Sequence, residues 1–371
     1  MSAPRGDDRT NATSREDLFG SRPVIPVSAQ PPSDELRRLA RILPRNVRLG
    51  SSSWAFPGWK GIVWSEFSST ANLANDGLPA YSRHPLLRTA GIDRTYYRPM
   101  SVGQYWRFYD QVPDDFHFLI KAPATVCDSS VRDDRGRRLN DNPVFLNAQR
   151  AADEFVSPVL EGLRDKAGPL VFQLSAVPRE WISTQEKRLA LIGRLGKFFD
   201  DLPSIGSDAP NAFYALEVRT PEIYTPRLTA MLRQRHVRLV VGLHPSMPDV
   251  LRQTVAVLTE DGIAADAAEP ALKGPLVVRW SLAQGDRFGE AKRRLAPFSA
   301  LQQPDPLTRE GIANLVMAAV RGRQRAYVVA NNKAEGCAPL SMKALAERIA
   351  SKLIADRDRR QKMAAMPRGS G

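Results

Sequence analysis

The feature that most constrains this 371-residue chain is the alternation of short apolar runs with stretches of helical periodicity. The β-rich runs share a continuous apolar character, and there are eight of them: 47–52, the stretch around 91–97, 116–122, 169–175, 213–219, 237–244, 275–281 and 326–332. Continuous apolar runs are typical of strands buried on both faces of a parallel sheet. Strict strand–helix alternation through eight units predicts a single (β/α)8 TIM-type barrel.

Amphipathic helices are expected between the strands. The segments with helical patterns are 102–111, 143–166, 183–198, 226–234, 248–258, 307–320 and 342–354. Only 81–89, which contains Pro85, gives a weak helical pattern for the first unit. A doubly wound open sheet is the alternative fold. It would normally carry a GxGxxG phosphate turn after the first strand, and the sequence GSSSWAFPGW at that place does not match it.

The two ends differ in composition from the middle of the chain. Residues 1–45 are rich in Pro, Ser, Asp and Arg and show no sustained apolar periodicity, and residues 356–371 are charged. Such segments bury too little apolar surface to offset the entropy of ordering them. We therefore predict a disordered extension at 1–45, the barrel domain at 46–355 and a basic disordered tail at 356–371.

Charge and cysteine content narrow the function classes. The chain has 53 Lys and Arg against 40 Asp and Glu, a net charge of +13, which favours attraction to anions without defining an activity. Two cysteines are too few for a disulfide framework and lack paired zinc spacing. Neither a signal-peptide core nor a run long enough to span a membrane is present in the sequence. We expect a soluble cytoplasmic protein, with no cofactor and no membrane association.

Polar residues close most of the predicted strands. In barrels of this class the active site lies where the strands end, so these residues are the candidate site. The predicted catalytic residues are Glu217, Lys121 and Asp93. The predicted substrate-binding residues are Ser52, Trp54, Tyr97, Arg98, Gln173, Arg219, His244, Arg279, Asn331 and Asn332.

Each candidate also has a structural interpretation. Glu217 and Arg219 share one face of a strand, where they are either an acid–base group beside an anion-binding arginine or a structural ion pair. Lys121 either binds a phosphate or carboxylate, losing its proton if desolvated, or packs its stem while its head reaches solvent. The aromatic residues of 52–67 either stack on a ligand or cover apolar surface, and we favour the covering role.

Two further site types were weighed. Only Asp93, Glu217 and His244 are typical metal ligands at the predicted strand ends, so no metal site is predicted. The basic segment 281–298 follows the seventh strand, where barrels often bind phosphate. It is either such a phosphate site or a solvated basic helix face.

Several motifs together resemble the YecE-like family, also called domain of unknown function 72. The motifs are LGSSSWAFPGWKGIVW, IDRTYYRPMSVGQYWRFYDQVPDDFHFLIKAP, AGPLVFQL, ALEVR and VVANNKAEGCAP, and they span about residues 47 to 349. The resemblance implies a TIM-type barrel and no established activity. The family pattern points to Ser52, Trp54, Gly58, Trp59, Tyr97, Arg98, Lys121, Gln173, Glu217, Arg219, Asn331, Asn332, Gly336 and Pro339.

The chain departs from that pattern at several positions. Asp93 stands where a Glu is usual, His244 where an Asp is usual, and Ser53 where a Gly is usual. Where Thr-His is usual after Lys-Ala-Pro, this chain has Thr-Val-Cys at 125–127. Where Leu-His is usual next to an Arg, it has Trp-Ser at 280–281. The expected function is a hydrolase-like or isomerase-like enzyme acting on an anionic small molecule, phosphorylated or derived from nucleic acid. The alternatives are a non-catalytic nucleic-acid-binding protein and a scaffold for a protein partner that the sequence does not identify.

Overall fold

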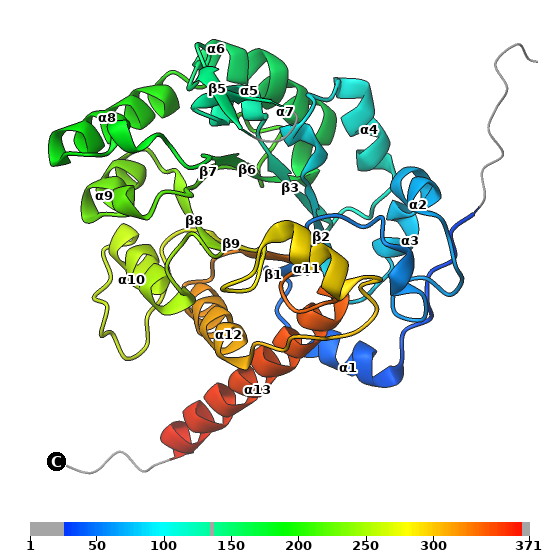
Figure 1. The fold of residues 1–371 in the computed structure, drawn as a ribbon. Coiled ribbons are helices and arrows are strands. Elements are labelled where there is room, and N and C mark those ends of the chain that lie inside the picture. Colours follow the sequence, from blue (N-terminus) through cyan, green and yellow to red (C-terminus); the bar gives the residue numbers. More distant parts are fainter. Residues whose placement is uncertain (1–25, 134–136, 366–371) are drawn as a thin grey trace, which may run out of the picture.

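The structure, a computed structural model, describes residues 26–133 and 137–365. Eight parallel strands form a closed barrel, which confirms the predicted (β/α)8 fold (Figure 1). Its strands are β1 (Val47–Ser51), β2 (Leu87–Ile92), β3 (His117–Lys121), β6 (Ala167–Gln173), β7 (Phe213–Glu217), β8 (Arg238–Leu243), β9 (Leu276–Trp280) and β10 (Ala326–Ala330). Each strand pairs with the next barrel strand along the chain, and β10 closes the barrel against β1.

Helices surround the barrel in the described part of the chain (Figure 1). The α-helices are α1 (Asp34–Ile42), α2 (Thr70–Asp76), α3 (Leu78–Tyr81), α4 (Val102–Asp110), α5 (Ala124–Cys127), α6 (Ala148–Ala151), α7 (Ser157–Leu163), α8 (Gln185–Asp200), α9 (Pro226–Gln234), α10 (Val250–Glu260), α11 (Phe288–Leu295), α12 (Pro306–Arg321) and α13 (Ala338–Ala365). Several begin at a capping side chain. Thr184 caps α8 and Asp305 caps α12, and each accepts a hydrogen bond from a first-turn backbone N–H.

A layer of apolar side chains fills the inside of the barrel. Its members each come from a different strand and are fully or almost fully buried: Leu119, Val171, Ala215, Val240, Val277 and Val329. Phe213 packs against this layer. Ala215 and Phe213 therefore face the interior, as the alternation along β7 predicts. Side chains two residues after the layer point inward as well, one step nearer the carboxyl ends of the strands.

The second unit of the barrel differs from its prediction. β2 begins at Leu87 and ends at Ile92, so the expected strand around 91–97 is too late by about four residues. The chain turns after Ile92 because Thr95 Oγ1 donates to the carbonyl oxygens of Ile92 (2.8 Å) and Lys121 (2.5 Å). The weak helix expected over 81–89 is also wrong beyond its first residue, since helix α3 ends at Tyr81.

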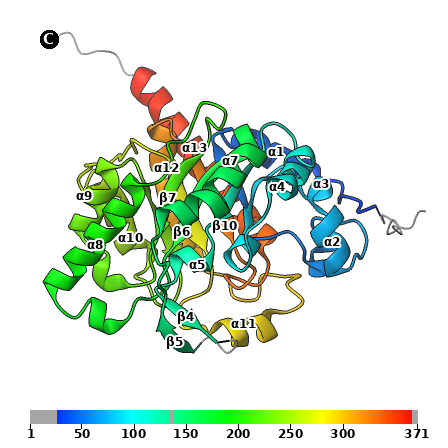
Figure 2. The same cartoon turned by 90° about the horizontal axis from the view of Figure 1, so that it is seen from above.

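The segment between β3 and β6 contains structure that the sequence pattern did not predict. An antiparallel hairpin pairs β4 (Ser130–Arg132) with β5 (Arg138–Asp141), and in Figure 2 it lies at the same end of the barrel as α11. The single helix expected over 143–166 is divided into α6, a π-helical stretch at Ala152–Val156, and α7. Short polar strands such as β5 have no apolar alternation, so period-2 patterning does not detect them.

Both ends contain helix where disorder was predicted. Helix α1 lies within 1–45, is capped by Ser33 and buries Leu39 and Ala40 against the core. Helix α13 continues to Ala365, which corrects the predicted tail for residues 356–365. In that part of α13, Asp356 pairs with Arg359 at 2.5 Å and with Arg360 at 3.0 Å. Residues 1–25 and 366–371 of the two predicted extensions lie outside the described residues.

Candidate functional site

A cavity of about 510 Å3 opens at the carboxyl ends of the barrel strands, and we call it the mouth cavity. Its lining residues are Ser52, Ser53, Asp93, Tyr97, Lys121, Gln173, Ser175, Ala176, Arg219, His244, Ser246, Arg279, Ser281, Leu282, Phe288 and Asn331. Nine of the thirteen predicted site residues are in this set: Ser52, Asp93, Tyr97, Lys121, Gln173, Arg219, His244, Arg279 and Asn331. The size is in the range of small-molecule sites.

Strand geometry explains why polar side chains meet here. Each residue of the interior apolar layer is followed two positions later by a residue on the same inward face. Those inward residues are Lys121, Gln173, Glu217, Gly242, Arg279 and Asn331. The barrel core therefore ends in a polar layer at the mouth, built by the same alternation that builds the apolar layer below it.

Arg279, on β9, contacts β6, β7 and the turn after β2 across the inside of the barrel. It donates from Nη1 to Gln173 Oε1 at 2.9 Å and to Glu217 Oε2, and from Nη2 to both oxygens of Asp93 at 3.0 and 3.1 Å. Its side chain is only 4% exposed. Burial lowers the pKa of Arg279, but Asp93 and Glu217 outweigh it, and the net direction is upward. Arg279 is therefore a permanent cation in the wall of the cavity.

Glu217 lies beneath the mouth cavity and does not line it. Its side chain has no exposed area, and its two oxygens contact different arginines: Arg219 Nη2 at 2.5 Å and Arg279 Nη1. A Cβ added at Gly242 would lie 3.0 Å from Glu217 Oε1, so glycine on β8 leaves the room that this carboxylate occupies. Burial raises the pKa of Glu217, but the two arginines outweigh it, and the net direction is downward. The Glu217 carboxylate is therefore ionised and forms ion pairs with both arginines, which favours the interpretation as a structural ion pair.

Lys121 ends β3 and reaches the cavity from an apolar strand. Its Nζ lies 3.5 Å from the centroid of the Tyr96 ring, and Tyr96 is fixed by a 3.0 Å hydrogen bond between its hydroxyl and Ser175 Oγ. Burial and then Arg279 lower the pKa of Lys121 to about 8, although Asp93 and Glu217 act in the opposite direction. An amine with a pKa near neutrality both attracts anions and exchanges a proton near pH 7.

His244, after β8, is a neutral member of the lining. Its Nδ1 lies 2.9 Å from Ser246 Oγ. Burial and then Arg219 lower its pKa to about 4. Around neutral pH this ring therefore adds hydrogen-bonding capacity to the cavity and no charge.

The charges around the mouth cavity leave a positive excess. Three cations, Lys121, Arg219 and Arg279, line it against two carboxylates, Asp93 in the lining and Glu217 beneath, so the net charge is +1 when Lys121 is protonated. Arg279 is committed to its two carboxylates. Arg219 reaches Gln173 and Ser281 only at 3.5 Å besides its ion pair with Glu217. Lys121 and Arg219 are therefore the cations that can interact with a bound anion.

The structure places three of the other predicted residues away from the cavity. Trp54 is buried and packs edge-on against Phe108, with the ring centroids 5.3 Å apart. Arg98 is exposed and lines a separate hollow. Asn332 Oδ1 accepts hydrogen bonds from Trp59 Nε1 at 3.2 Å and from the backbone N–H of Ala338 at 2.8 Å. Trp59 and Trp64 are also fully buried, as the covering role predicted for the aromatic residues of 52–67 requires, whereas Phe67 is exposed.

Sequence reasoning missed other residues of the site. Ser175, Ser246 and Phe288 line the cavity, and none of them was among the predicted site residues. Ser175 ends the predicted run 169–175, whereas Ser246 and Phe288 close no apolar run. Lys333, which does not line the cavity but contacts Phe288, was also missed. Its Nζ lies 4.1 Å from the Phe288 ring centroid, and burial and then Lys292 lower its pKa to about 8. Lys333 directly follows Asn331 and Asn332, two predicted site residues, and that position could have indicated it.

The basic segment 281–298 adopts mainly its surface interpretation. Arg294 pairs with Asp286 at 2.7 Å, and the Arg287 side chain is 85% exposed, with Glu290 at 3.9 Å. Lys292 and Arg293 are exposed on α11. None of these four cations is in the lining of the mouth cavity.

The described residues, 26–133 and 137–365, lack two other kinds of site. They contain no cluster of three or more His, Cys, Asp or Glu side chains that could hold a metal ion. None of their helices has both the length and the apolar character that crossing a membrane requires.

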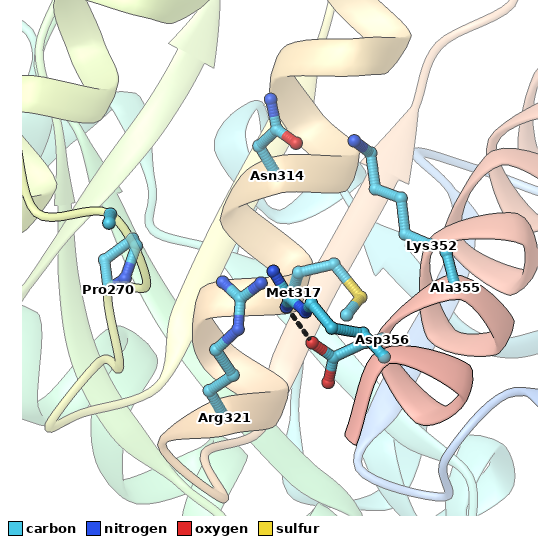
Figure 3. A pocket seen from close by; sticks show the side chains of 9 residues that line it. Pro270, Asn314, Met317, Arg321, Lys352, Ala355 and Asp356 are labelled. Atoms are coloured by element: carbon cyan, nitrogen blue, oxygen red, sulfur yellow. Dashed lines mark hydrogen bonds and ion pairs between the residues drawn. The ribbon is translucent and has the colours of Figure 1, made fainter. Parts of the chain in front are cut away.

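A second cavity, of about 480 Å3, lies between α12, α13 and the loop before β9 (Figure 3). Arg321, Lys352 and Asp356 surround it. Lys352 pairs with Glu310 at 2.5 Å, and Asp356 with Arg359 at 2.5 Å. Arg321 ends α12 just before β10, so this groove lies toward the amino-terminal end of the barrel, opposite the mouth. Arg321, Lys352 and Arg359 line it against Asp356, and Glu310 and Glu269, outside the lining, pair with Lys352 and Arg359 at 2.5 Å each.

Comparisons with known proteins agree with this architecture. A family model described as "Protein of unknown function DUF72" matches residues 48–364. The chain belongs to the DUF72 family. The match begins in β1 and ends in α13, so the whole barrel and its mouth lie inside it.

Solved DUF72 proteins share the fold at low sequence identity. One from Thermotoga maritima MSB8 is 16% identical with a TM-score of 0.51, over 82% of this chain and 98% of its own. Another, from Enterococcus faecalis V583, is 17% identical with a TM-score of 0.50, over 81% and 95%. At this identity the likeness concerns the fold alone. No curated protein matches the chain.

Proposed function

We propose that this DUF72 barrel is an enzyme that binds an anionic, phosphorylated small molecule in the mouth cavity. The observation that carries the proposal is the placement of Lys121 and Arg219 in one cavity, above a buried carboxylate that orients Arg219. Five serine hydroxyls and two side-chain amides accompany them: Ser52, Ser53, Ser175, Ser246, Ser281, Gln173 and Asn331. A phosphoryl group accepts hydrogen bonds from all four donor types, ammonium, guanidinium, hydroxyl and amide.

Lys121 is the group best suited to transfer a proton. General acid–base catalysis works best when the pKa of the group lies near the working pH, and the pKa of Lys121 is about 8. Glu217 is enclosed by two arginines, and Asp93 is paired with Arg279 through both oxygens. Those contacts favour Lys121 over either carboxylate as the base that removes a proton or the acid that returns it. Hydrolysis and isomerisation both need such a step.

A binding protein for nucleic acid is the second candidate. The observation that favours it is the exposed basic surface beside the mouth, made of Arg287, Lys292 and Arg293. Binding through that surface would fall steeply with salt, because each neutralised phosphate releases counterions. It would also be insensitive to Lys121 and Arg219, which lie inside the cavity.

Thermal melting in sodium phosphate and in sodium chloride at equal ionic strength tests the proposal. A ligand at about ten times its Kd adds about 1.4 kcal/mol to the free energy of unfolding, so phosphate is expected to raise the melting temperature above that in chloride. Because Arg219→Gln also removes an ion pair, the quantity compared is the phosphate-minus-chloride difference within each variant.

That difference is expected to shrink in Lys121→Met and in Arg219→Gln. It should persist in Arg41→Gln, which removes an exposed arginine of α1, before β1 and so at the other end of the barrel. Equal melting in the two salts for the wild-type protein would contradict the proposed anion site. A phosphate effect that persists in both cavity variants would move the site to the exposed basic surface.

A further inference from the structure

Exposed aromatic side chains are few in the part of the chain that the structure describes. Those that are more than half exposed are Tyr97 at 84%, Phe67 at 71% and Phe288 at 61%. Two of these three, Tyr97 and Phe288, line the mouth cavity. Large aromatic groups gain free energy when they are buried, so their exposure around one polar cavity needs a reason other than packing.

Each of the two rings is held by a neighbour on one side. Tyr97 meets the Tyr96 ring edge to face, with centroids 5.4 Å apart and planes at 89°. Tyr96 is itself held between Ser175 and Lys121. The Tyr97 ring is thus oriented by residues of the cavity while most of its surface stays open.

Phe288 is positioned by the periodicity of α11. It is the first residue of that helix and lies on the same stripe as Ala291 and Leu295, which are buried. At Phe288 the apolar stripe leaves the core and reaches the mouth cavity. Lys333 Nζ lies 4.1 Å from the ring centroid and fixes its position.

We infer that Tyr97 and Phe288 form a ring-binding part of the mouth cavity, so that the substrate class is a phosphomonoester carrying an aromatic or heteroaromatic ring. The inference rests on the proposed function, since Lys121 and Arg219 hold the phosphoryl group. The two aromatic residues come from different segments, the turn after β2 and the start of α11, and both line the mouth cavity, where a ligand ring would meet them. Aromatic pairs favour offset-stacked or edge-to-face contacts, which two independent rings can provide to a third.

Calorimetric titration with three phosphate monoesters at pH 7 tests the inference on the full chain. The probes are methyl, cyclohexyl and phenyl phosphate, and release of inorganic phosphate is followed in the same samples so that turnover is not mistaken for binding. Stacking on a protein aromatic changes affinity on the order of tenfold. We therefore expect phenyl phosphate to bind about tenfold more tightly than methyl phosphate, and more tightly than cyclohexyl phosphate, which has a ring without a π-system.

Three variants identify the residues responsible. Tyr97→Ala and Phe288→Ala are each expected to reduce the phenyl-to-methyl affinity ratio while leaving the Kd for methyl phosphate within about twofold, because neither ring carries the charge. Phe67→Ala is the matched control. It removes an equally exposed aromatic outside the cavity and should leave the ratio unchanged.

The possible results separate the two proposals. If methyl and phenyl phosphate bind equally well, or the ratio survives in both cavity variants, the ring-binding role is wrong and the anion site stands. If cyclohexyl matches phenyl phosphate, the surface is merely apolar and the aromatic class is wrong. If none of the esters binds, the proposed function fails and this inference fails with it.

Discussion

Replacing Glu217 by glutamine tests how the polar layer of the barrel is held together. The carboxylate has no exposed area, and its partners Arg219 and Arg279 have side chains that are 10% and 4% exposed. Glutamine has nearly the same shape but no charge, and its amide group places N–H donors against guanidinium donors. Arg279 keeps Asp93 as a partner, whereas Arg219 keeps only contacts at 3.5 Å to Gln173 and Ser281. The variant therefore leaves Arg219 as a nearly buried cation without a counter-charge.

The size of the loss follows from that isolation. Removing one partner of a buried ion pair costs about 3–5 kcal/mol, and the retained Asp93 contact favours the lower end. We expect the free energy of unfolding to fall by about 3 kcal/mol in urea denaturation. For a domain of this size that corresponds to roughly 4–5 °C in the melting temperature. Glu222→Gln is the control, because Glu222 is exposed on the 3-10 turn Pro221–Ile223 and its loss should change stability by less than about 0.5 kcal/mol.

The pH dependence of the same variant gives a second readout. The folded-state pKa of Glu217 is lowered, so its contribution to stability is present above the unfolded-state pKa of about 4.3 and is lost as the pH falls through the folded-state pKa. The difference between wild-type protein and Glu217→Gln should therefore be full at pH 7 and shrink below about pH 4. If Glu217→Gln unfolds like the wild type at pH 7, the carboxylate is not a structural anchor and the reasoning is refuted.

Three further predictions concern Lys121, Asn332 and Glu260. Because the pKa of Lys121 is about 8, the affinity for methyl phosphate should fall between pH 7 and 9, and Lys121→Arg should flatten that titration; an equal slope in both proteins would contradict it. Asn332→Ala should lower the free energy of unfolding in urea by about 1–3 kcal/mol, because two buried N–H donors lose their acceptor. It should leave the phosphate-minus-chloride difference in melting temperature unchanged. Loss of that difference would show that Asn332 does take part in anion binding. Burial raises the pKa of Glu260 to about 7 despite Arg238, so as the pH rises the unfolded chain loses this proton before the folded protein does. The free energy of unfolding should therefore decline between about pH 4.3 and 7, and Glu260→Gln should lack this decline. The same pH dependence of stability in wild-type protein and Glu260→Gln would refute the raised pKa.

The barrel could be predicted from the sequence because its strands are continuously apolar. Runs such as 169–175 and 326–332 coincide with β6 and β10 to within two residues at each end. The second strand was placed too late because Leu87–Ile92 contains Arg88, Thr89 and Gly91, which weaken its apolar character. Helix α1 was missed because it is short and polar apart from the few side chains that it buries against the rest of the fold.

The candidate site was partly predictable, because inward strand ends can be counted by parity. That rule finds Lys121, Gln173, Arg279 and Asn331, which all line the mouth cavity. The rule also places Glu217 on the inward face. It does not show whether a side chain reaches the cavity, and Arg219 and Arg279 separate the Glu217 carboxylate from it. Phe288 lies on a helix after β9, and only the folded packing of α11 brings it to the cavity.

The most direct test of the proposed anion site is a crystal structure of the full chain grown without phosphate and then soaked in sodium phosphate near pH 7. The account predicts density for a phosphate ion within hydrogen-bonding distance of Lys121 Nζ and Arg219, with Glu217 still enclosed by its two arginines. It also predicts that the same soak of Arg219→Gln crystals leaves that position without phosphate. Phosphate bound only at Arg287 or Arg293, with the mouth cavity holding water alone, would contradict the account.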